Sequence, residues 1–325
     1  MNQQSTVNMS RTDWLKARQS GIGGSDIAAL MGVSPYKTAY DIYLDKTREI
    51  EADEMSEAAY WGTRLEALVA DEYALRNNVK VQRVNFLIRS EEYPFACANI
   101  DRAVVNPAIS GTVRVSKDGS LSTDKLLEIK TSSAYLNKNW GDEGSDLVPD
   151  HYLLQCQWYM GITKVPTCDL AVLIGGNKYQ QYTINFDEDL FAEMIAVAGE
   201  FWENLQNGIS PDPVSYENIR HKYRRAEIGS ILDITENEQA VELVSSYLDL
   251  KDREKAVNDE LNDLKKDIAV LFADKETMVL DKQIVMTYKN QTSKRLDSSK
   301  LRKEHPELIG SYEKVSETRV LRVAA

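Results

Sequence analysis

A short apolar stretch near the middle of the chain, residues 126–131, carries two charged side chains two positions apart. They are Glu128 and Lys130, and Ile129 lies between them. Because successive side chains of a β-strand point to opposite faces, a strand here puts the carboxylate and the ammonium on one face and the isoleucine on the other. The stretch therefore predicts a half-buried strand with a charged pair on one face.

Asp101 is expected to close an antiparallel strand just upstream of this stretch. Its carboxylate can then meet Glu128 and the backbone carbonyl of Ile129 around a divalent cation, and such hard oxygen ligands suit Mg²⁺ or Mn²⁺ rather than zinc. Lys130 would stand beside the cation and orient an attacking water, or help to remove its proton, while the metal stabilises charge on a phosphate. The pattern indicates phosphodiester hydrolysis.

The same triplet has a simpler interpretation. An acidic residue two positions before a lysine occurs by chance in most chains of this size. Glu128 and Lys130 would then be a solvated pair of little energetic weight. The triplet alone does not decide between the two interpretations, so the surrounding residues matter.

The charge balance restricts the kinds of partner. With 39 Lys+Arg against 51 Asp+Glu, the net charge is −12, which argues against a protein that coats nucleic acid by general electrostatic attraction. A nucleic-acid site in this chain must be a local basic lining within an acidic exterior. The three cysteines, Cys97, Cys156 and Cys168, lack paired metal-ligand spacing and are predicted to be buried free thiols.

The length of 325 residues and the hydrophobic content of 42% predict one ordinary domain with an appendage, or two domains. Residues 1–10 lack the charged and then apolar pattern of a signal peptide, and no apolar run approaches the length that spans a membrane. A cytoplasmic protein without a membrane partner is therefore expected.

A glycine-rich bend at residues 21–26 follows a short predicted helix at residues 13–18. Ser25 or Asp26 is the expected N-cap of the next helix. Free N–H groups at a helix start bind phosphate, especially beside an arginine, and Arg18 is close in sequence. The alternative is an ordinary capped turn with Arg18 exposed.

A long helix is predicted at residues 58–77, with Trp61, Leu65, Leu68 and Tyr73 or Ala74 on one apolar stripe. Glu66 lies at the edge of that stripe. It is either a solvated glutamate or, if the helix packs over the charged strand, a group within reach of the metal.

A second helix is predicted at residues 149–161, where Tyr152, Gln155 and Tyr159 fall on a single face. An amide and a phenol directed at one place suit the positioning of water and phosphate, or else Tyr159 is a packed core residue.

The remaining elements complete an α/β domain over residues 1–216. Further strands are predicted at residues 79–89, 94–105, 168–175 and 179–186, and a further helix at residues 189–207.

Two further segments follow this domain. Residues 217–276 are predicted to form a connector and a coiled-coil-like helix, or one arm of a helical hairpin, because apolar residues alternate in steps of four and three from Leu243 to Leu271. Residues 277–325 carry ten Lys+Arg against six Asp+Glu and are predicted to form a small basic β-rich tail. Its short strands are expected at residues 278–280, 284–288 and 318–323.

Five motifs occur in a characteristic order over residues 10–215. They are Trp14-x-x-x-Arg18 with Gly-Ile-Gly-Gly-Ser25-Asp, Trp61-Gly-x-x-x-Glu66, Asn-Ile-Asp101, Glu128-Ile-Lys130 and Tyr152-x-x-Gln155-x-Gln157. Together they resemble the YqaJ-type viral recombinase exonucleases, relatives of phage lambda exonuclease. The resemblance implies the PD-(D/E)xK nuclease fold, an α/β core with a central mixed sheet flanked by helices.

The resemblance also implies a role for each motif residue. The catalytic core is Asp101, Glu128, Lys130 and Gln155; the metal ligands are Glu66, Asp101, Glu128 and the Ile129 carbonyl; the residues that hold a 5′-phosphate are Arg18 and Ser25; and the supporting residues are Trp14, Tyr152 and Gln157.

The reaction implied is Mg²⁺-dependent 5′→3′ digestion of one strand of linear double-stranded DNA, with Mn²⁺ as a substitute for Mg²⁺. The partners implied are a single-strand annealing protein and, as in some relatives, two further copies of the chain in a trimeric ring. The location implied is the cytoplasm of a bacterial host, with a phage or prophage as the origin of the protein. Two other functions stay open. One is an endonuclease with the same site, and the other is a non-catalytic DNA-binding scaffold.

Overall fold

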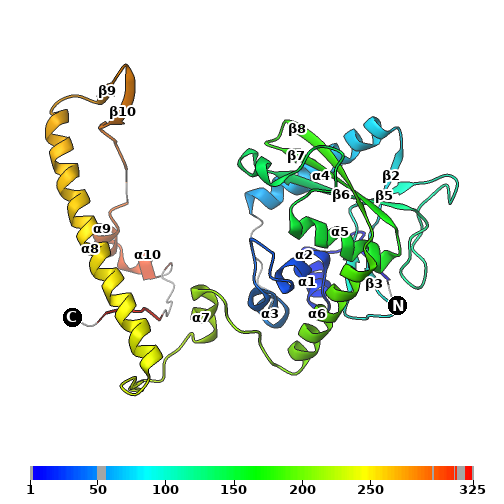
Figure 1. Ribbon diagram of the computed structural model, residues 1–325, viewed down its shortest axis with the longest axis horizontal. Coiled ribbons are helices and arrows are strands. Elements are labelled where there is room, and N and C mark those ends of the chain that lie inside the picture. The colour runs from blue at the N-terminus through cyan, green and yellow to red at the C-terminus, as the bar shows by residue number, and fades with distance from the viewer. Residues whose placement is uncertain (1–2, 50–55, 295, 311, 313–318, 324–325) are drawn as a thin grey trace. The chain divides into compact units, whose positions relative to one another are not determined.

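A five-stranded mixed sheet centred on β6 (Lys125–Ser132) organises the first of two units of the chain, Met1–Ile219 (Figure 1). In spatial order the strands are β2 (Lys80–Arg83), β5 (Arg102–Val105), β6, β7 (Thr167–Ile174) and β8 (Lys178–Asn185). β6 and β7 run parallel, whereas the other neighbours are antiparallel. This computed structural model describes residues 3–49, 56–294, 296–310, 312 and 319–323.

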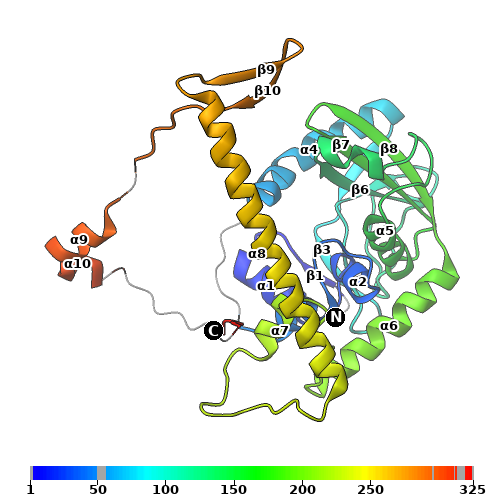
Figure 2. The same cartoon turned by 60° about the vertical axis from the view of Figure 1, so that its left-hand side comes forward.

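The two faces of β6 are covered by different helices, as Figure 2 shows. Leu127 and Ile129 pack against Tyr73 and its neighbours on α4 (Glu57–Asn77). The opposite face, which carries Glu128 and Lys130, is covered by α5 (Asp150–Thr163). The alternation predicted from the sequence is confirmed, and with it an α/β core whose mixed sheet is flanked by helices.

The helices α2 (Gly24–Leu30) and α6 (Glu188–Gln206) pack against α5 and thicken the layer on that face. The remaining elements of this unit are α1 (Arg11–Gln19), α3 (Ala39–Thr47), the 3₁₀ helix η1 (Ala134–Asn139) and a small antiparallel sheet of β1 (Gln3–Ser5), β3 (Phe86–Arg89) and β4 (Cys97–Asn99).

Two predicted strands were wrong in the same way. Residues 79–89 and 94–105 each form two strands, and each pair divides between the two sheets. The apolar pattern continues across both breaks, because Val84 in the first and Ile100 in the second are themselves buried. As a consequence, Asp101 does not close a strand but directly precedes β5, between the two sheets.

The predicted stripe of α4 is confirmed only in the second half of the helix. Tyr73 is buried as predicted, together with Val69 and Ala70, whereas Trp61 and Leu68 are 55% and 63% exposed. The second half makes the apolar contact with the sheet, while Glu66 in the first half reaches the sheet through ion pairs with arginines.

The second unit, Arg220–Ala325, consists mainly of one continuous helix, α8 (Glu238–Phe272). An antiparallel hairpin of β9 (Thr277–Leu280) and β10 (Gln283–Thr287) follows, and then the short helices α9 (Ser298–Glu304) and α10 (Pro306–Gly310). The predicted long helix and the hairpin strands are confirmed. The predicted strand at 318–323 is wrong over its described residues, 319–323, and the two short helices were not predicted.

All three cysteines are buried free thiols, as predicted. Across the described part of the chain, none of the helices combines the length and apolar composition that crossing a bilayer requires.

The helix α7 (Tyr216–Lys222) is tied to the first unit by Asn218, which is 1% exposed. Its amide nitrogen donates to Asp41 Oδ1 at 2.8 Å, and Thr38 Oγ1 donates to its amide oxygen at 2.9 Å. A chain that ended before Asn218 would leave Asp41 in α3 and Thr38, the N-cap of that helix, without these two hydrogen bonds.

We therefore expect Asn218→Ala to lower the free energy of unfolding by about 1–3 kcal/mol, the range for removing one partner of a buried hydrogen bond. Glu217→Ala, at an exposed position of the same helix, is the matched control and should be neutral. Urea unfolding of both variants measures the difference, and equal stabilities would contradict the anchoring role of Asn218.

Candidate active site

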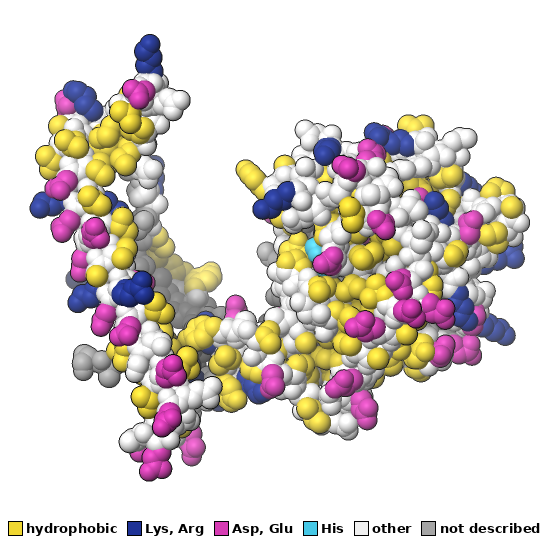
Figure 3. Space-filling model, viewed as in Figure 1, with side chains coloured by type: hydrophobic (Ala, Val, Ile, Leu, Met, Phe, Trp, Pro, Cys, Tyr) yellow, Lys and Arg dark blue, Asp and Glu magenta, His cyan; other side chains and the backbone are white. Residues whose placement is uncertain are grey.

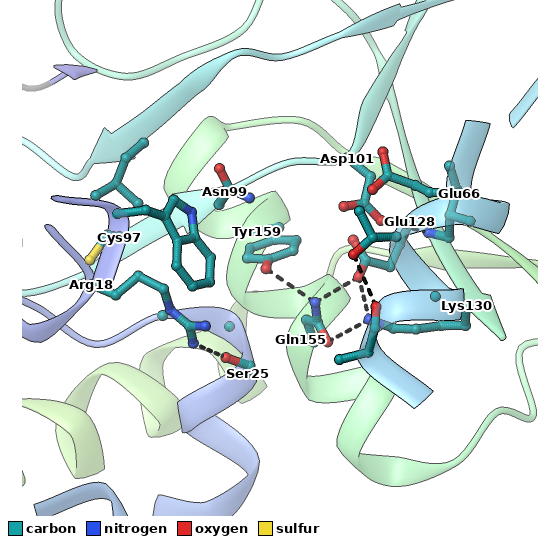
Figure 4. A pocket seen from close by; sticks show the side chains of 18 of the residues that line it. Arg18, Ser25, Glu66, Cys97, Asn99, Asp101, Glu128, Lys130, Gln155 and Tyr159 are labelled. Carbon is teal, nitrogen blue, oxygen red and sulfur yellow. Dashed lines mark hydrogen bonds and ion pairs between the residues drawn. The ribbon is translucent and has the colours of Figure 1, made fainter. Parts of the chain in front are cut away.

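A cavity of about 350 Å³ opens beside the charged face of β6 (Figure 4). The residues singled out by the sequence that line it are Trp14, Arg18, Ser25, Glu66, Asp101, Glu128, Ile129, Lys130 and Gln155. Asp101, Glu66, Glu128 and Lys130 gather at one end in Figure 4, and Arg18 with Ser25 lies at the other. Side chains more than a hundred positions apart in the sequence thus face a single space.

Glu128 and Lys130 form the centre of this site. Lys130 Nζ lies 2.5 Å from Glu128 Oε1 and donates to Gln155 Oε1 at 3.0 Å. The amide nitrogen of Gln155 in turn donates to Glu128 Oε1 at 2.6 Å and contacts the Tyr159 hydroxyl at 3.1 Å. The predicted shared face of Gln155 and Tyr159 on α5 is confirmed, and it lies against the charged face of β6.

Asp101 is held by the backbone of the central strand. Its Oδ2 accepts a hydrogen bond from the Ile129 N–H at 3.0 Å, which fixes the carboxylate at the edge of β6. Asp101 lies just before β5, where the backbone pairing of β5 with β6 stops. Its side chain takes over there, because it accepts from the Ile129 N–H in place of a backbone carbonyl of a longer β5. The break between β4 and β5 is therefore what brings Asp101 to the site.

Burial places strong electrostatic constraints on these groups. Burial and the nearby Glu128 raise the pKa of Asp101 well above its ordinary value, and burial likewise raises the pKa of Glu128. Burial alone would lower the pKa of Lys130, but the carboxylates of Glu128 and Asp101 outweigh it and raise that pKa. Lys130 is therefore a cation at neutral pH.

One oxygen in this group has no protein partner. Glu128 Oε2 is buried and accepts no hydrogen bond, while Oε1 of the same carboxylate is shared by Lys130 and Gln155. A buried carboxylate oxygen without a donor is costly, so it marks a position for a cation or water. Among the described residues no three Asp, Glu, His or Cys side chains already form a metal-binding cluster.

Glu66 reaches the cavity from α4 but is bound elsewhere. Its Oε1 accepts from Arg102 at 2.6 Å and from Arg83 at 3.2 Å. The neighbouring Arg102 Nη1 also donates to the Asp101 carbonyl at 2.7 Å. Glu66 is thus held by two arginines through Oε1, so it is not directed at the other two carboxylates alone. To bind a metal through this oxygen it would have to exchange a partner.

At the other end of the cavity, Arg18 Nη2 donates to Ser25 Oγ at 2.5 Å, and the Arg18 guanidinium lies 4.8 Å from the Trp14 ring centroid. The expected cap was wrong, because Gly23 is the N-cap of α2 and Ser25 and Asp26 lie inside the helix. Asp26 accepts from the Gly23 N–H at 2.9 Å and pairs with the buried Lys46 at 2.7 Å.

A glycine allows α2 to approach this closely. A Cβ at Gly24 would lie 2.5 Å from the Tyr159 ring and 3.0 Å from Gln155. Only a residue without a side chain leaves Tyr159 and Gln155 in place between the two ends of the cavity.

The supporting residues separate into two groups. Trp14 lines the cavity, and the Tyr152 ring lies 5.0 Å from Lys130 Nζ, a cation–π contact. Gln157 does not line it. Its amide donates to the Asn185 carbonyl at 2.8 Å and accepts from the Asp187 N–H at 2.9 Å, so it joins α5 to the end of β8.

Three site residues were missed by the sequence reasoning. Asn99 lines the cavity, Arg102 binds Glu66, and Lys46 neutralises Asp26. Asn99 is the first residue of the Asn-Ile-Asp101 motif and Arg102 directly follows it, so the motif was the signal that could have found them. The sequence around Lys46 carried no such signal, because its role depends on how α3 packs on α2.

Comparisons with known proteins identify the family of the chain. Residues 13–166 match the model of the YqaJ-like viral recombinase domain. The chain is 32% identical over 315 residues to an uncharacterized protein, YqaJ, of Bacillus subtilis, covering 94% of this chain and 91% of that protein. It is 28% identical over 157 residues to protein R354 of Acanthamoeba polyphaga mimivirus, covering 48% of this chain and 27% of that protein. The chain belongs to the YqaJ-like viral recombinase family.

Among solved structures, the chain resembles an alkaline exonuclease from Laribacter hongkongensis, with a TM-score of 0.44 and 19% identity over 65% of this chain and 97% of that one. It also resembles a putative exonuclease from Eubacterium rectale, with a TM-score of 0.39 and 12% identity over 72% of this chain and 98% of that one.

The raised pKa of Asp101 leads to a prediction about stability in the absence of metal. From pH 3.8 up to that raised pKa, the folded protein holds a proton that the unfolded chain has released, so stability falls as the pH rises through this window. Asp101→Asn removes the titration. In EDTA the variant should therefore be more stable than the wild type at neutral pH, and the difference should shrink on acidification.

Urea unfolding across a pH series measures this difference. Asp71→Asn, at an exposed position of α4, is the control and should follow the wild type at every pH. Parallel stability curves for Asp101→Asn and the wild type would show that Asp101 carries no folding-linked proton.

Proposed function

We propose that this protein is a metal-dependent deoxyribonuclease that digests one strand of linear double-stranded DNA from a 5′ end. The observation that carries the proposal is the convergence of Asp101, Glu128 and Lys130 on one end of a cavity whose other end holds Arg18 beside Ser25. Membership of the viral recombinase family supports DNA as the substrate.

The residues at the site fit a hard divalent cation. Asp101 and Glu128 are both buried and repel each other, and Glu128 Oε2 lacks a partner. A cation between them would reduce the repulsion between the two carboxylates and would give Glu128 Oε2 a partner. Oxygen ligands favour Mg²⁺, with Mn²⁺ as a substitute. The Ile129 carbonyl and, after exchange of Arg102, Glu66 would complete the set. When bound, such an ion would supply charge stabilisation at a phosphate.

The protein's own groups have separate tasks in this mechanism. Lys130, cationic and fixed by Glu128 and Gln155, orients the attacking water and stabilises the negative charge that grows on the phosphate. The carboxylates of Glu128 and Asp101 raise its pKa and keep it protonated in the metal-free protein, which suits it to orient this water. Tyr152 packs on the Lys130 ammonium and restricts its movement.

Arg18 and Ser25 are proposed to bind the terminal 5′-phosphate. A guanidinium stacked on Trp14 presents a rigid fork that matches two phosphate oxygens. A 5′-phosphate bound beside Arg18 and Ser25 would determine which phosphodiester reaches the carboxylates. Digestion would therefore run in the 5′→3′ direction. The remaining strand would pass to a single-strand annealing protein.

An endonuclease is the second candidate, because the cavity is open to solvent and the same chemistry serves both reactions. A covalently closed plasmid distinguishes them, since only an endonuclease cuts it. The scaffold alternative requires an impaired site, and every proposed catalytic position holds a residue able to do its task.

Lys130→Ala is expected to lower the cleavage rate by at least about 1,000-fold and to change duplex affinity by less than about 3-fold, because the ammonium acts mainly on the transition state. Single-turnover digestion and binding in Ca²⁺ measure the two quantities. Lys164→Ala, an exposed lysine away from the cavity, is the control. Cleavage within a few-fold of wild type would remove Lys130 from the mechanism.

Asp101→Asn and Glu128→Gln are each expected to weaken Mg²⁺ and Mn²⁺ binding by about 10-fold or more, because a neutral amide keeps the shape but loses the charge that holds the ion. Calorimetry of the DNA-free protein measures this without reference to activity, and Asp71→Asn again serves as the control. Wild-type affinity in both variants would place the metal elsewhere.

Arg18→Ala should abolish the preference for 5′-phosphorylated over 5′-hydroxyl ends, with a smaller effect of Ser25→Ala. Digestion of paired duplexes that differ only in the 5′ group measures this preference, with Arg114→Ala, an exposed arginine, as the control. If the wild type digests both duplexes at equal rates, Arg18 does not bind a 5′-phosphate.

A further inference from the structure

The helix α8 presents an apolar seam along its whole length. Five side chains spaced seven positions apart each expose more than half of their surface: Leu243, Leu250, Val257, Leu264 and Leu271. Between them, in steps of four and three, lie Tyr247, Glu254, Leu261 and Ile268. Figure 3 shows apolar side chains along this helix between acidic and basic ones.

This spacing has the period of a coiled-coil seam, in which each side chain inserts between four residues of a facing helix. The hairpin that follows α8 does not cover the seam. It contacts the helix end, where Phe272 is buried and its ring lies 5.6 Å from that of Tyr288, while Leu271 beside it stays exposed.

We propose that α8 forms an antiparallel two-stranded coiled coil with α8 of a second copy of this chain. A two-fold axis near the middle of the helix aligns the two copies over their full length. It sets Leu250 against Leu261 of the partner subunit, Tyr247 against the partner's Leu264, and Leu243 against the partner's Ile268. Such a seam is self-complementary, as a two-fold interface requires.

The charges on α8 select this partner and this orientation. Arg253 and Glu260 flank the seam on one side, and the antiparallel alignment brings Arg253 of each copy to Glu260 of the other. It also sets Glu254 against Val257 of the partner subunit. A parallel pair in register would instead face Glu254 with its own copy, which costs free energy for two seam carboxylates.

Glu254 is already partly neutralised within its own helix, because Lys251 Nζ lies 2.5 Å from Glu254 Oε2. The seam can therefore tolerate this single polar position. None of the cavity residues belongs to α8, so the pairing is independent of the proposed nuclease function.

Sedimentation of the full-length protein without DNA over a concentration series tests the self-association. The wild type should be a dimer that dissociates on dilution, and Leu250→Glu with Leu261→Glu should raise the dissociation constant by more than about 100-fold. The matched control is Ala256→Glu with Asn262→Glu, which adds the same charge to the opposite face and should dimerise like the wild type.

A wild type that stays monomeric throughout the series would overturn the proposal, since the seam would then be covered by its own chain or by another protein. A dimer that persists in Leu250→Glu with Leu261→Glu would overturn it too, because the contact would lie outside α8.

Cysteine cross-linking under oxidised glutathione tests the orientation without disrupting the fold. The chain's own cysteines are buried, so introduced thiols report alone. Leu250→Cys combined with Leu261→Cys should give a covalent dimer, and Leu250→Cys alone should not. Efficient cross-linking of the single variant would mean a parallel pair and would contradict the antiparallel arrangement.

Discussion

The contact between Glu128 and Lys130 is the interaction on which the first unit depends. β6 is the middle strand of its sheet and is covered on both faces, so charges on it would be strongly unfavourable without partners. The protein supplies these partners from α5 through Gln155, and it anchors Asp101 on the backbone of the same strand. The helix layer over this face is therefore arranged around a polar group as well as an apolar core.

An acidic protein can hold the proposed phosphate site only through a local surplus of positive charge. Two cations line the cavity among the described residues, Lys130 and Arg18. Lys130 pairs with Glu128, whereas Arg18 donates to the neutral Ser25 and lies 3.5 Å from Asp26. Because Asp26 pairs more closely with Lys46, at 2.7 Å, Arg18 is proposed to attract a phosphate at one end, and a divalent ion is proposed to do so at the other.

The sequence predicted the parts of the site that depend on local periodicity. Glu128 and Lys130 were expected on one face because a strand alternates, and helical spacing placed Gln155 on one face with Tyr152 and Tyr159, while its place beside Glu128 was implied only by the family resemblance. The break before Asp101 and the exposure of the first half of α4 were not predictable from periodicity, since they depend on which sheet each segment joins. Arg102 was missed for the same reason, because its pairing with Glu66 crosses two elements.

The reaction proposed for the cavity is cleavage of a DNA strand from its 5′ end, with a metal held by Asp101 and Glu128. The most direct test is a linear duplex that carries different labels at the 5′ and 3′ ends of one strand, digested by the full-length protein in Mg²⁺ and sampled over time. We expect early release of the 5′ label, late loss of the 3′ label, and no release in EDTA. Release of the 3′ label first, or an equal rate in EDTA, would contradict the proposed reaction.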